Sequence, residues 1–596
     1  MKYNIKDNFN ISGTIGLNTI NRTIETAIPV YTPNTQLVWV DDLQLVTRNT
    51  RNISPGEYTK TNGRNTNIDA TILANYTTQL NSDLNLNITG GYNVFNRETN
   101  RVTGETIGGL VVPGWYNFAN SAQQANSTQR STKYRLFGIF GNASLGWRNQ
   151  IFLEYSARND WSSTLPEDNN SFFYQGVGAS VILSEMLDLD GNGAISFIKL
   201  RGGAGTTGRD AGLYLIQSTY IGNPILRNYP NHNITLPLNG QPGFTVSDVI
   251  GNPNLRPELT TLYEVGADIG FFNNRINLEY TYYNSVHSDQ IVQVDLPSSS
   301  GFRRTTANIG EMTNKGHELR LNLRPIQGMV DGLTWDLDFI YSKNTNEVVS
   351  ISEDSDELII GGPYTNAAVS LVAKEGLPFG TFKSTVPSMT DDGRMIVDSE
   401  GFPVLTDEEE YLGAYQPDFQ ASIGTRIGYK GLSLNVLFDI RQGGEFFSIT
   451  KDQVEFNGTA LSTLIGNREP FVIENSVIDN GDGTYSENTT EVTAQELYAI
   501  SGTAFGGNSL LIDASFVKLR ELGLTYTVPR RHLENSPISG LSVSVFGSNL
   551  KFWLPEENTY ADPEVNGSQL SGNAVGVETT QTPPSRSYGV RLGLTF

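Results

Sequence analysis

The chain has 596 residues, of which 38% are hydrophobic and 17% charged, and its formal net charge is −22. An acidic excess of this size repels phosphate backbones, so nucleic acid is excluded as an expected partner. The absence of cysteine excludes a disulfide scaffold, a thiol nucleophile and a cysteine-ligated metal. No apolar run is long enough for a membrane helix, but a β-barrel also satisfies its backbone groups in lipid, so a membrane protein built from strands stays open.

The chain begins inside an alternating pattern, which predicts strands from the first residues onward. No apolar core of a signal peptide precedes the pattern. The alternating apolar positions at this end are Tyr3, Ile5, Phe9, Ile11, Ile15 and Leu17. We therefore expect this chain to be the later part of a longer protein or an incomplete reading frame.

The same alternation recurs along the chain in segments of about ten residues, each with one apolar and one charged or polar face. Strand pairs joined by short links are predicted at 68–92, 134–157, 263–282, 319–341 and 421–440. Segments of this kind are typical of amphipathic strands that separate an apolar surrounding from a polar one. About 17 strands are expected over the whole chain.

The links between the predicted strands alternate between short and long. The short links are LNSD, WRNQ, FFNN and KG, with somewhat longer ones at 185–195, 325–332 and 529–540. The long links are predicted at roughly 22–65, 97–132, 209–259, 284–314, 345–417, 443–513 and 552–585, with a modest one near 159–170. Strands that run up and down with one plain end and one elaborate end produce this pattern.

The predicted fold is therefore all-β: a transmembrane antiparallel up-and-down β-barrel with long extracellular loops and short periplasmic turns. A stack of β-sandwich domains requires linkers, and a propeller requires a repeat of about 40–50 residues; neither is present. In the closing segment SYGVRLGLTF, we expect five side chains to face lipid: Tyr588, Val590, Leu592, Leu594 and Phe596. The side chains of Arg591 and Thr595 are expected to face the lumen.

Several stretches resemble the SusC/RagA family of TonB-dependent transporters of the Bacteroidota. GNPNLRPELTTLYEVGADIGFFNNRINLEYTYYNSVHSDQI (251–291) resembles the family's NP-x-L-x-PE segment and the strand pair after it. ARNDWSSTLPEDNNSFFYQGVGASVILSE (157–185) resembles its R-x-D-x-SS motif and the following strand. FIKLRGGAGTTG (197–208), TNKGHELRLNLRPI (313–326), SFVKLRELGLTYTVP (515–529) and GSNLKFW with DPEVNG (547–567) are similar to later segments. The order and spacing of these segments make the resemblance specific.

The resemblance implies a barrel of about 22 strands, of which residues 1–596 are the C-terminal part, so that the barrel is incomplete at about 17 strands. The signal peptide, N-terminal extension and plug are expected to be absent from this chain. The implied function is outer-membrane import of oligosaccharides or peptides, with no enzymatic step and no cofactor. The implied partners are a SusD-like surface lipoprotein, TonB–ExbB–ExbD through the missing N-terminal part, and outer-membrane lipid.

Two other functions remain open at this stage. One is an outer-membrane structural or adhesive β-barrel without active transport. The other is a secreted glycan hydrolase with stacked β domains, although no Ser-hydrolase elbow, Walker loop or convincing carboxylate pair is found.

Aromatic residues in the long links are the best candidates for contacts with a glycan or peptide ligand, because ring faces stack on sugars and on peptide side chains. The candidates are Trp115, Tyr116, Phe118, Tyr220, Tyr229, Tyr364, Trp553 and Tyr560. For each of them, packing between loops or contact with the partner lipoprotein is an equally good interpretation.

Other motifs favour structural interpretations. DLDGNGAIS (188–196) matches the start of an EF-hand loop but has Lys199 where a bidentate glutamate is needed, so a turn is favoured. DNGDGT (479–484) is a slightly better candidate for a loop-bound cation; no metal site is predicted from either. NPNLRPE could belong to a ligand surface but is favoured as a rigid lead-in to a strand. Arg158 and Asp160 are expected to form an ion pair or a backbone contact near a strand end, and not a catalytic pair.

Overall fold

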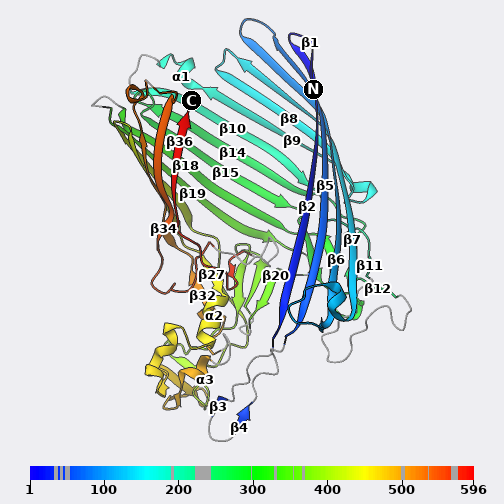
Figure 1. Ribbon diagram of the computed structural model, residues 1–596, viewed down its shortest axis with the longest axis vertical. Coiled ribbons are helices and arrows are strands. Elements are labelled where there is room, and N and C mark those ends of the chain that lie inside the picture. Colours follow the sequence, from blue (N-terminus) through cyan, green and yellow to red (C-terminus); the bar gives the residue numbers. More distant parts are fainter. Residues whose placement is uncertain are drawn as a thin grey trace.

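A wide antiparallel sheet of 17 strands is the central feature of the chain, and it curls into a barrel wall (Figure 1). This computed structural model describes residues 1–596 except 32–37, 41–43, 47–53, 190–193, 222–242, 297, 328–331, 353–354, 366–368, 499–503, 535 and 565–574. Both termini lie at the end of the wall that carries the short turns (Figure 1).

The strands of the wall pair in chain order, each antiparallel to the next. They are β1 (Lys2–Lys6), β2 (Phe9–Tyr31), β5 (Ser54–Gln79), β6 (Leu84–Leu110), β7 (Ser121–Trp147), β8 (Ile151–Ser162), β9 (Ser171–Ile182), β10 (Ile195–Arg209), β14 (Glu258–Phe271), β15 (Ile276–Ser288), β18 (Glu311–Gln327), β19 (Thr334–Ser350), β25 (Phe419–Tyr429), β26 (Leu432–Gln442), β33 (Phe516–Thr527), β34 (Gly540–Trp553) and β36 (Ser587–Thr595). The predicted antiparallel up-and-down topology is confirmed.

The two faces of the wall differ as the alternation predicts. On the outer face large apolar side chains are exposed: Val177 is 56% exposed and Val265 57%. In β36 the outer residues are Tyr588, Val590, Leu592 and Leu594, and Phe596 follows directly after the strand; all five are exposed. On the inner face charged groups pair across strands, as Arg201 Nη1 does with Asp268 Oδ1 at 3.1 Å. An apolar exterior around a polar interior is the arrangement that a barrel in a bilayer requires.

Three of the short links, WRNQ, FFNN and KG, form tight turns in which residues adopt left-handed backbone conformations. In the KG link, Lys430 has φ of 48° and Gly431 of 89°, as a two-residue hairpin between right-twisted strands demands. In the WRNQ link, Arg148 and Asn149 have φ of 50° and 57°. A short helix, α1 (Leu183–Met186), lies in the link between β9 and β10. The predicted alternation of short and long links is confirmed.

The prediction of a long loop is wrong over much of the length of two segments. The links expected at 22–65 and 97–132 are mostly strand, because β2 and β5 approach each other to Tyr31 and Ser54, and β6 and β7 to Leu110 and Ser121. Threonine and asparagine occupy both faces here, so apolar alternation ends while the backbone ladder continues. β6 has 27 residues, whereas a strand crosses a bilayer in about 9–11, so more than half of it projects beyond the bilayer.

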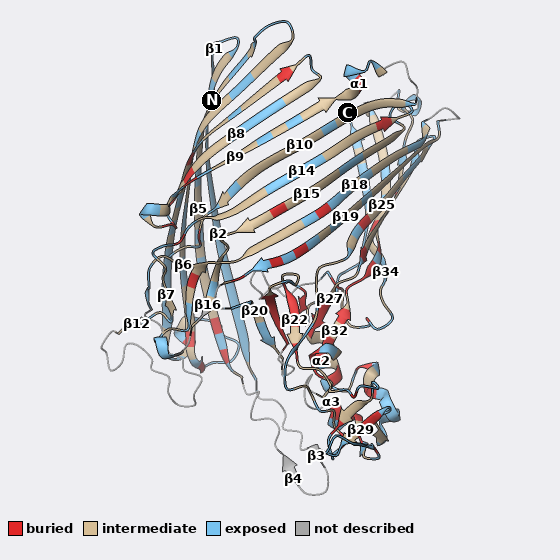
Figure 2. Cartoon of the chain, turned by 180° about the vertical axis from the view of Figure 1, so that it is seen from behind, coloured by how far each residue is buried: buried red, intermediate tan, exposed pale blue. Residues whose placement is uncertain are grey.

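The best-buried apolar core lies in the extracellular loops and not in the wall. Val369, Leu371, Phe382, Phe447, Leu510 and Val577 are each 0% exposed and form one cluster. Figure 2 shows the buried residues gathered in this region, beyond the end of β19 and β25. The loops 351–418 and 443–515 therefore fold into a module with its own hydrophobic core.

The loop module consists of small sheets and helices. One sheet contains β20 (Glu357–Tyr364), β21 (Val369–Lys374), β22 (Thr381–Ser384) and β24 (Glu410–Ala414), and a second contains β27 (Glu445–Ser448), β32 (Leu511–Asp513) and β35 (Val577–Glu578). Beside them lie β23 (Met395–Val397), β28 (Phe471–Val472), β29 (Ser476–Asp479), β30 (Tyr485–Glu487), β31 (Glu491–Val492), α2 (Ile449–Phe456) and α3 (Ala494–Tyr498). In the part of the chain described, no helix has the length and hydrophobicity needed to span a membrane.

The remaining loops carry short strand pairs. They are β3 (Val38–Val40) with β4 (Gln44–Val46), β11 (Tyr220–Ile221) with β12 (Thr245–Val246), and the sheet of β13 (Val249–Ile250), β17 (Arg304–Asn308) and β16 (Ile291–Asp295). The second and third groups lie beside the projecting part of β7, as both overall views show (Figures 1 and 2).

Candidate ligand-binding surfaces

The NPNLRPE segment locks three extracellular loops together at the rim of the wall. Leu255 is 0% exposed and packs with Leu165, Phe172 and Ala211. Asn169 Nδ2 donates to the carbonyl oxygen of Leu255 at 3.2 Å. β14 begins directly after the segment, at Glu258. The interpretation of this motif as a rigid lead-in to a strand is therefore supported.

A buried carboxylate, Asp160, and a half-buried one, Asp210, hold the neighbouring rim. Asp160 Oδ1 accepts from Arg158 Nη2 at 2.7 Å, which confirms the expected ion pair, and Asp160 Oδ2 accepts from Tyr174 at 2.7 Å. Asp210 accepts from the hydroxyls of Tyr134, Ser162 and Thr164. These bonds join the ends of β7, β8, β9 and β10, so the R-x-D-x-SS motif has a structural role in fixing the rim.

The first three predicted aromatic residues lie in the turn between β6 and β7. Trp115 is 50% exposed. Tyr116 and Phe118 instead pack on Tyr58, with ring centroids 6.4 and 5.2 Å apart. The turn is fixed by Asn120, whose Nδ2 donates to the carbonyl oxygens of Val112 and Trp115 at 2.8 and 2.6 Å. Of the three, Trp115 is the one available to a ligand.

Two of the other predicted aromatic residues pack in the loop module. Tyr364 lies against Phe447 with centroids 6.1 Å apart, and burial raises the pKa of its hydroxyl. Tyr560 packs beside Phe446, and Lys451 Nζ lies 5.5 Å from its ring centroid. Both rings therefore stabilise the loops against each other.

The last three predicted residues are dispersed. Trp553 lies with Phe438 at 6.3 Å between centroids, opposite the partly exposed Val517 of β33, on the outer face of the wall. Tyr220 is 75% exposed and lines a groove described below. Tyr229 lies outside the described residues. The structure does not bring the eight aromatic residues together in one site.

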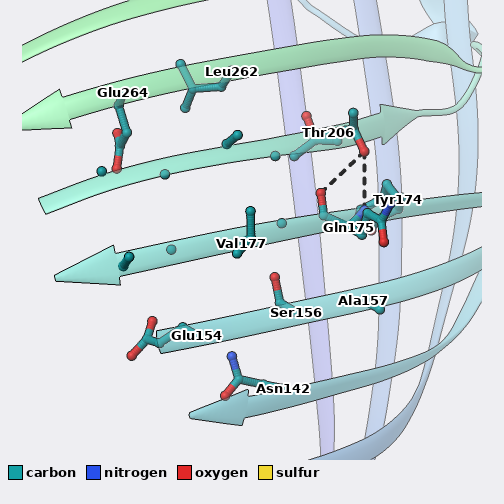
Figure 3. A pocket seen from close by; sticks show the side chains of 18 of the residues that line it. Asn142, Glu154, Ser156, Ala157, Tyr174, Gln175, Val177, Thr206, Leu262 and Glu264 are labelled. Atoms are coloured by element: carbon teal, nitrogen blue, oxygen red, sulfur yellow. Dashed lines mark hydrogen bonds between the residues drawn. The ribbon is translucent and has the colours of Figure 1, made fainter. Parts of the chain in front are cut away.

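One cavity lies on the wall at β7–β10, β14 and β15, with a volume of about 900 Å³. Its inner floor is bare backbone, because Gly176 pairs with Gly205 and Gly178 with Gly203 across β9 and β10. A Cβ atom at Gly178 would meet nothing within 4 Å. Figure 3 shows Glu154 and Glu264 on either side of this glycine floor. The polar rim and open floor suit passage or loose contact more than tight binding of a small molecule.

A second groove, of about 670 Å³, lies outside the membrane-spanning part of the wall. One side is formed by Thr128, Gln129 and Arg130 of β7. The other residues that line it are Leu213, Tyr214, Leu215, Gln217, Thr219, Tyr220, Ser247, Val249, Ile250, Gly251, Gln293 and Thr306. This groove is the place where a predicted ligand-binding aromatic residue, Tyr220, meets a concave surface.

An ion network around the buried Lys518, at the extracellular end of β33, was not predicted from the sequence. Lys518 has a fully buried side chain; its Nζ donates to Glu564 Oε2 at 2.6 Å and to Asp562. The rings of Phe516 and Phe552 lie on the same ammonium group, at 4.3 and 4.6 Å. The sequence offered two signals for this network: the alternating basic residues of SFVKLREL and the acidic residues of DPEVNG. Only the fold shows that these basic and acidic side chains contact each other.

Arg520 extends this network. Its guanidinium donates to Asp439 on β26 and to Glu564 in the loop that follows β34. Burial acts to raise the pKa of Glu564, but hydrogen bonds from Arg520 and Lys518 outweigh it and hold that pKa below its usual value. The network therefore fastens the loop after β34 to the wall by charge.

Neither candidate cation motif assembles a metal site in the described parts. In DNGDGT, Asp479 Oδ1 accepts from the backbone N–H of Gly481 at 2.8 Å and Asp482 Oδ1 from that of Thr484 at 3.0 Å, so both carboxylates close the turn. Residues 190–193 of DLDGNG lie outside the described residues. Over the described ranges, no group of three or more histidine and acidic side chains is placed to hold a metal ion.

Comparison with known proteins gives consistent matches. A family model described as "TonB dependent receptor-like, beta-barrel" matches residues 4–550. TonB-dependent receptor P26 of Formosa agariphila is 23% identical over 508 residues, which are 81% of this chain and 48% of that protein. TonB-dependent receptor SusC of Bacteroides thetaiotaomicron is 22% identical over 503 residues, 81% of this chain and 46% of that protein.

Among solved structures, that of the RagAB peptide transporter matches with a TM-score of 0.74 at 19% identity, over 100% of this chain and 61% of that chain. At this identity the match shows the fold alone. The chain spans about half the length of the curated relatives it matches.

Proposed function

Because the chain belongs to the TonB-dependent receptor family, in its SusC/RagA-like branch, we propose that it takes up oligosaccharides or peptides through the outer membrane. The family is not enzymatic, and its members lie in the outer membrane of Gram-negative bacteria. The observation that carries the proposal is the wall itself. Its outer face is apolar, its inner face is polar, and all its elaborate loops lie at one end.

The loops supply recognition in this proposal. Loops on a rigid scaffold commonly carry binding residues, and this chain places a groove, an exposed Trp115 and a core-containing module at the extracellular end. Uptake of a bound nutrient requires work, for which TonB–ExbB–ExbD is the proposed source. The contact with TonB is expected through an N-terminal part of the protein, as the resemblance to the SusC/RagA family implies.

A SusD-like surface lipoprotein is the proposed second partner. The loop module exposes a group of large apolar side chains at the end of α2 and after it: Phe456 at 47%, Leu461 at 73%, Leu464 at 47% and Ile465 at 43% exposed. Apolar groups of this kind on an extracellular module support contact with another protein.

Loss of the gene tests the proposal. We expect a deletion strain to lose uptake of either peptides or oligosaccharides, to recover it with the intact gene, and to lose it again when the proton gradient is collapsed. A deletion strain that takes up both classes of nutrient as well as its parent would contradict the proposal and favour a structural or adhesive barrel.

A further inference from the structure

Among the described residues, no strand pairs with one edge of the projecting half of β7, which is called the free edge below. On one side β7 pairs with β6 along its whole length, whereas on the other side β8 pairs with it only from Leu136 onward, because β8 ends at Ser162. In the described part of the chain no strand pairs with residues 121–135 of β7 on that second side. A row of backbone N–H and C=O groups therefore faces outward from an ordered strand.

The direction of these backbone groups follows from two hydrogen bonds near the rim. The N–H of Lys133 donates to Tyr214 Oη at 3.2 Å, and the N–H of Arg135 donates to Ser163 Oγ at 2.9 Å. Both partners lie on the free side, and backbone groups alternate sides along a strand. The register to β6 is regular here, so the N–H and C=O groups of Ser127, Gln129 and Ser131 also point to the free side.

The free edge opens into the groove of about 670 Å³. Gln129 and its two neighbours line one side, and Tyr214, Tyr220 and Val249 are among the residues of the other side. The opposite wall is held rigid: the N–H of Gly251 donates to Ser218 Oγ at 3.2 Å, and the N–H of Asn252 to the carbonyl oxygen of Leu215 at 2.9 Å. The groove thus has room beside the edge for an added segment of backbone.

The charge beside the edge is unusual for this protein. Arg130 pairs directly with Arg101 across β6 and β7, and both are exposed. Like charges directly opposite each other destabilise a sheet. No described carboxylate lies within salt-bridge distance of either guanidinium, although the chain has 63 acidic residues. An anionic group from outside the chain would relieve this repulsion.

We propose that an extended peptide with an acidic side chain adds as a strand to the free edge of β7 at Ser127–Ser131, with its carboxylate on Arg130 beside Arg101. Strand addition requires a ligand whose backbone N–H and C=O groups are spaced as in a β-strand. A glycan lacks such a backbone. The groove therefore selects peptides among the two proposed classes of cargo. This inference rests on the proposed function and specifies its substrate.

Replacement of Gln129 by proline tests the mode of binding. Proline removes the N–H that faces the groove and leaves the ladder to β6 intact, because that ladder uses the neighbouring residues. Gln129→Ala removes the side chain and keeps the N–H, so it is the matched control. Both variants are checked for a folded barrel by heat-modifiable migration on electrophoresis before binding is measured.

The probes are a short fluorescein-labelled peptide of alternating Glu and Val, its Gln/Val counterpart, and the Glu/Val peptide methylated at every second amide nitrogen. With purified protein in detergent, we expect Gln129→Pro to weaken binding of the Glu/Val peptide at least about tenfold relative to Gln129→Ala. The methylated peptide should bind as weakly to the unaltered protein. Arg130→Ala should reduce the affinity for Glu/Val to that for Gln/Val, and Arg130→Lys should restore part of it.

Equal affinities of the proline and alanine variants, equal binding of the methylated peptide, or no peptide binding at all would each overturn this inference. These failures differ from failure of the proposed function. A gene whose loss abolishes nutrient uptake, but whose Gln129→Pro variant binds peptides normally, refutes strand addition alone. A deletion strain with unchanged uptake refutes the transport role instead.

Discussion

Lys518 shows how one side chain fixes a loop to the wall. An ammonium group removed from water is tolerated only with close anionic partners, and Lys518 has Asp562 and Glu564 as well as two aromatic ring faces. The three groups come from β33 and from the loop after β34. Their contact therefore depends on the fold and not on nearness in the chain.

Removal of this ammonium group should release the loop. Lys518→Ala leaves two carboxylates close together without their buried cation, which costs about 3–5 kcal/mol. We expect faster hydrogen exchange at residues 554–564, measured by mass spectrometry. Lys551→Ala is the control, since Lys551 is exposed over the ring of Trp553. Equal exchange in the two variants would show that the ion network does not hold the loop.

Leu255 is the corresponding apolar anchor at the rim. Leu255→Ala removes a fully buried side chain from the cluster with Leu165, Phe172 and Ala211, which costs about 2–5 kcal/mol. We expect the rim to unfold at a lower temperature. Hydrogen exchange at residues 159–170 and 251–258 measures this change. Leu461→Ala, at a side chain 73% exposed, should leave these segments unchanged. A rim that stays protected in Leu255→Ala would contradict the anchoring role.

At the scale of elements, the attachment of the loop after β34 should depend on pH. The pKa of Glu564 is held below its ordinary value of 4.5 by Arg520 and Lys518. A carboxyl with a lowered pKa in the folded state stabilises that state above its ordinary pKa, and this contribution is lost as pH falls through the lowered value. Protection of residues 554–564 should therefore stay constant from neutral pH down to about 5 and decline below about 4.5.

Glu564→Gln provides the control for this pH dependence. Glutamine keeps a hydrogen-bonding side chain, but it is uncharged at every pH and therefore does not respond to acidification. The variant should start with weaker protection at neutral pH and change less as the solution is acidified. A decline in the unaltered protein that already begins near neutral pH would refute the role of this carboxylate.

The strands of the wall could be predicted because lipid and lumen impose alternation with a period of two, as in β36 and β26. The signal ends where the surrounding water wets both faces, so the projecting parts of β2, β5, β6 and β7 were predicted as loops. The binding surfaces were less predictable. Tyr364 and Tyr560 were predicted as ligand contacts because they lie in long loops, but they pack in the loop module. Burial within irregular loops leaves no periodic pattern in the sequence, so it could not be predicted.

At the scale of the whole molecule, the two faces of one strand should respond oppositely to a new charge. Val177 is 56% exposed on the outer face of β9, and Val177→Arg should destabilise the barrel by about 2–4 kcal/mol in a bilayer. Its neighbour Gly178 belongs to the glycine floor that faces the lumen, and a Cβ atom there would meet nothing within 4 Å. Gly178→Arg should fold nearly normally.

Assembly of the two variants into phospholipid vesicles measures this difference. We expect a reduced heat-modifiable fraction for Val177→Arg and a nearly unaltered fraction for Gly178→Arg. Equal fractions would mean that the outer face of β9 is not in contact with lipid. The measurement therefore examines the placement of the whole wall in the membrane through two adjacent residues.

The pairing of strands in chain order also bears on how the molecule folds. Each strand joins the one before it, so the wall can grow hairpin by hairpin, and short-range contacts are generally formed faster than distant ones. The loop module differs, because its core joins Val369 to Leu510 and Val577, residues that meet only after several hairpins are complete. We expect the wall to form first and the extracellular module to close over it as a later, slower step.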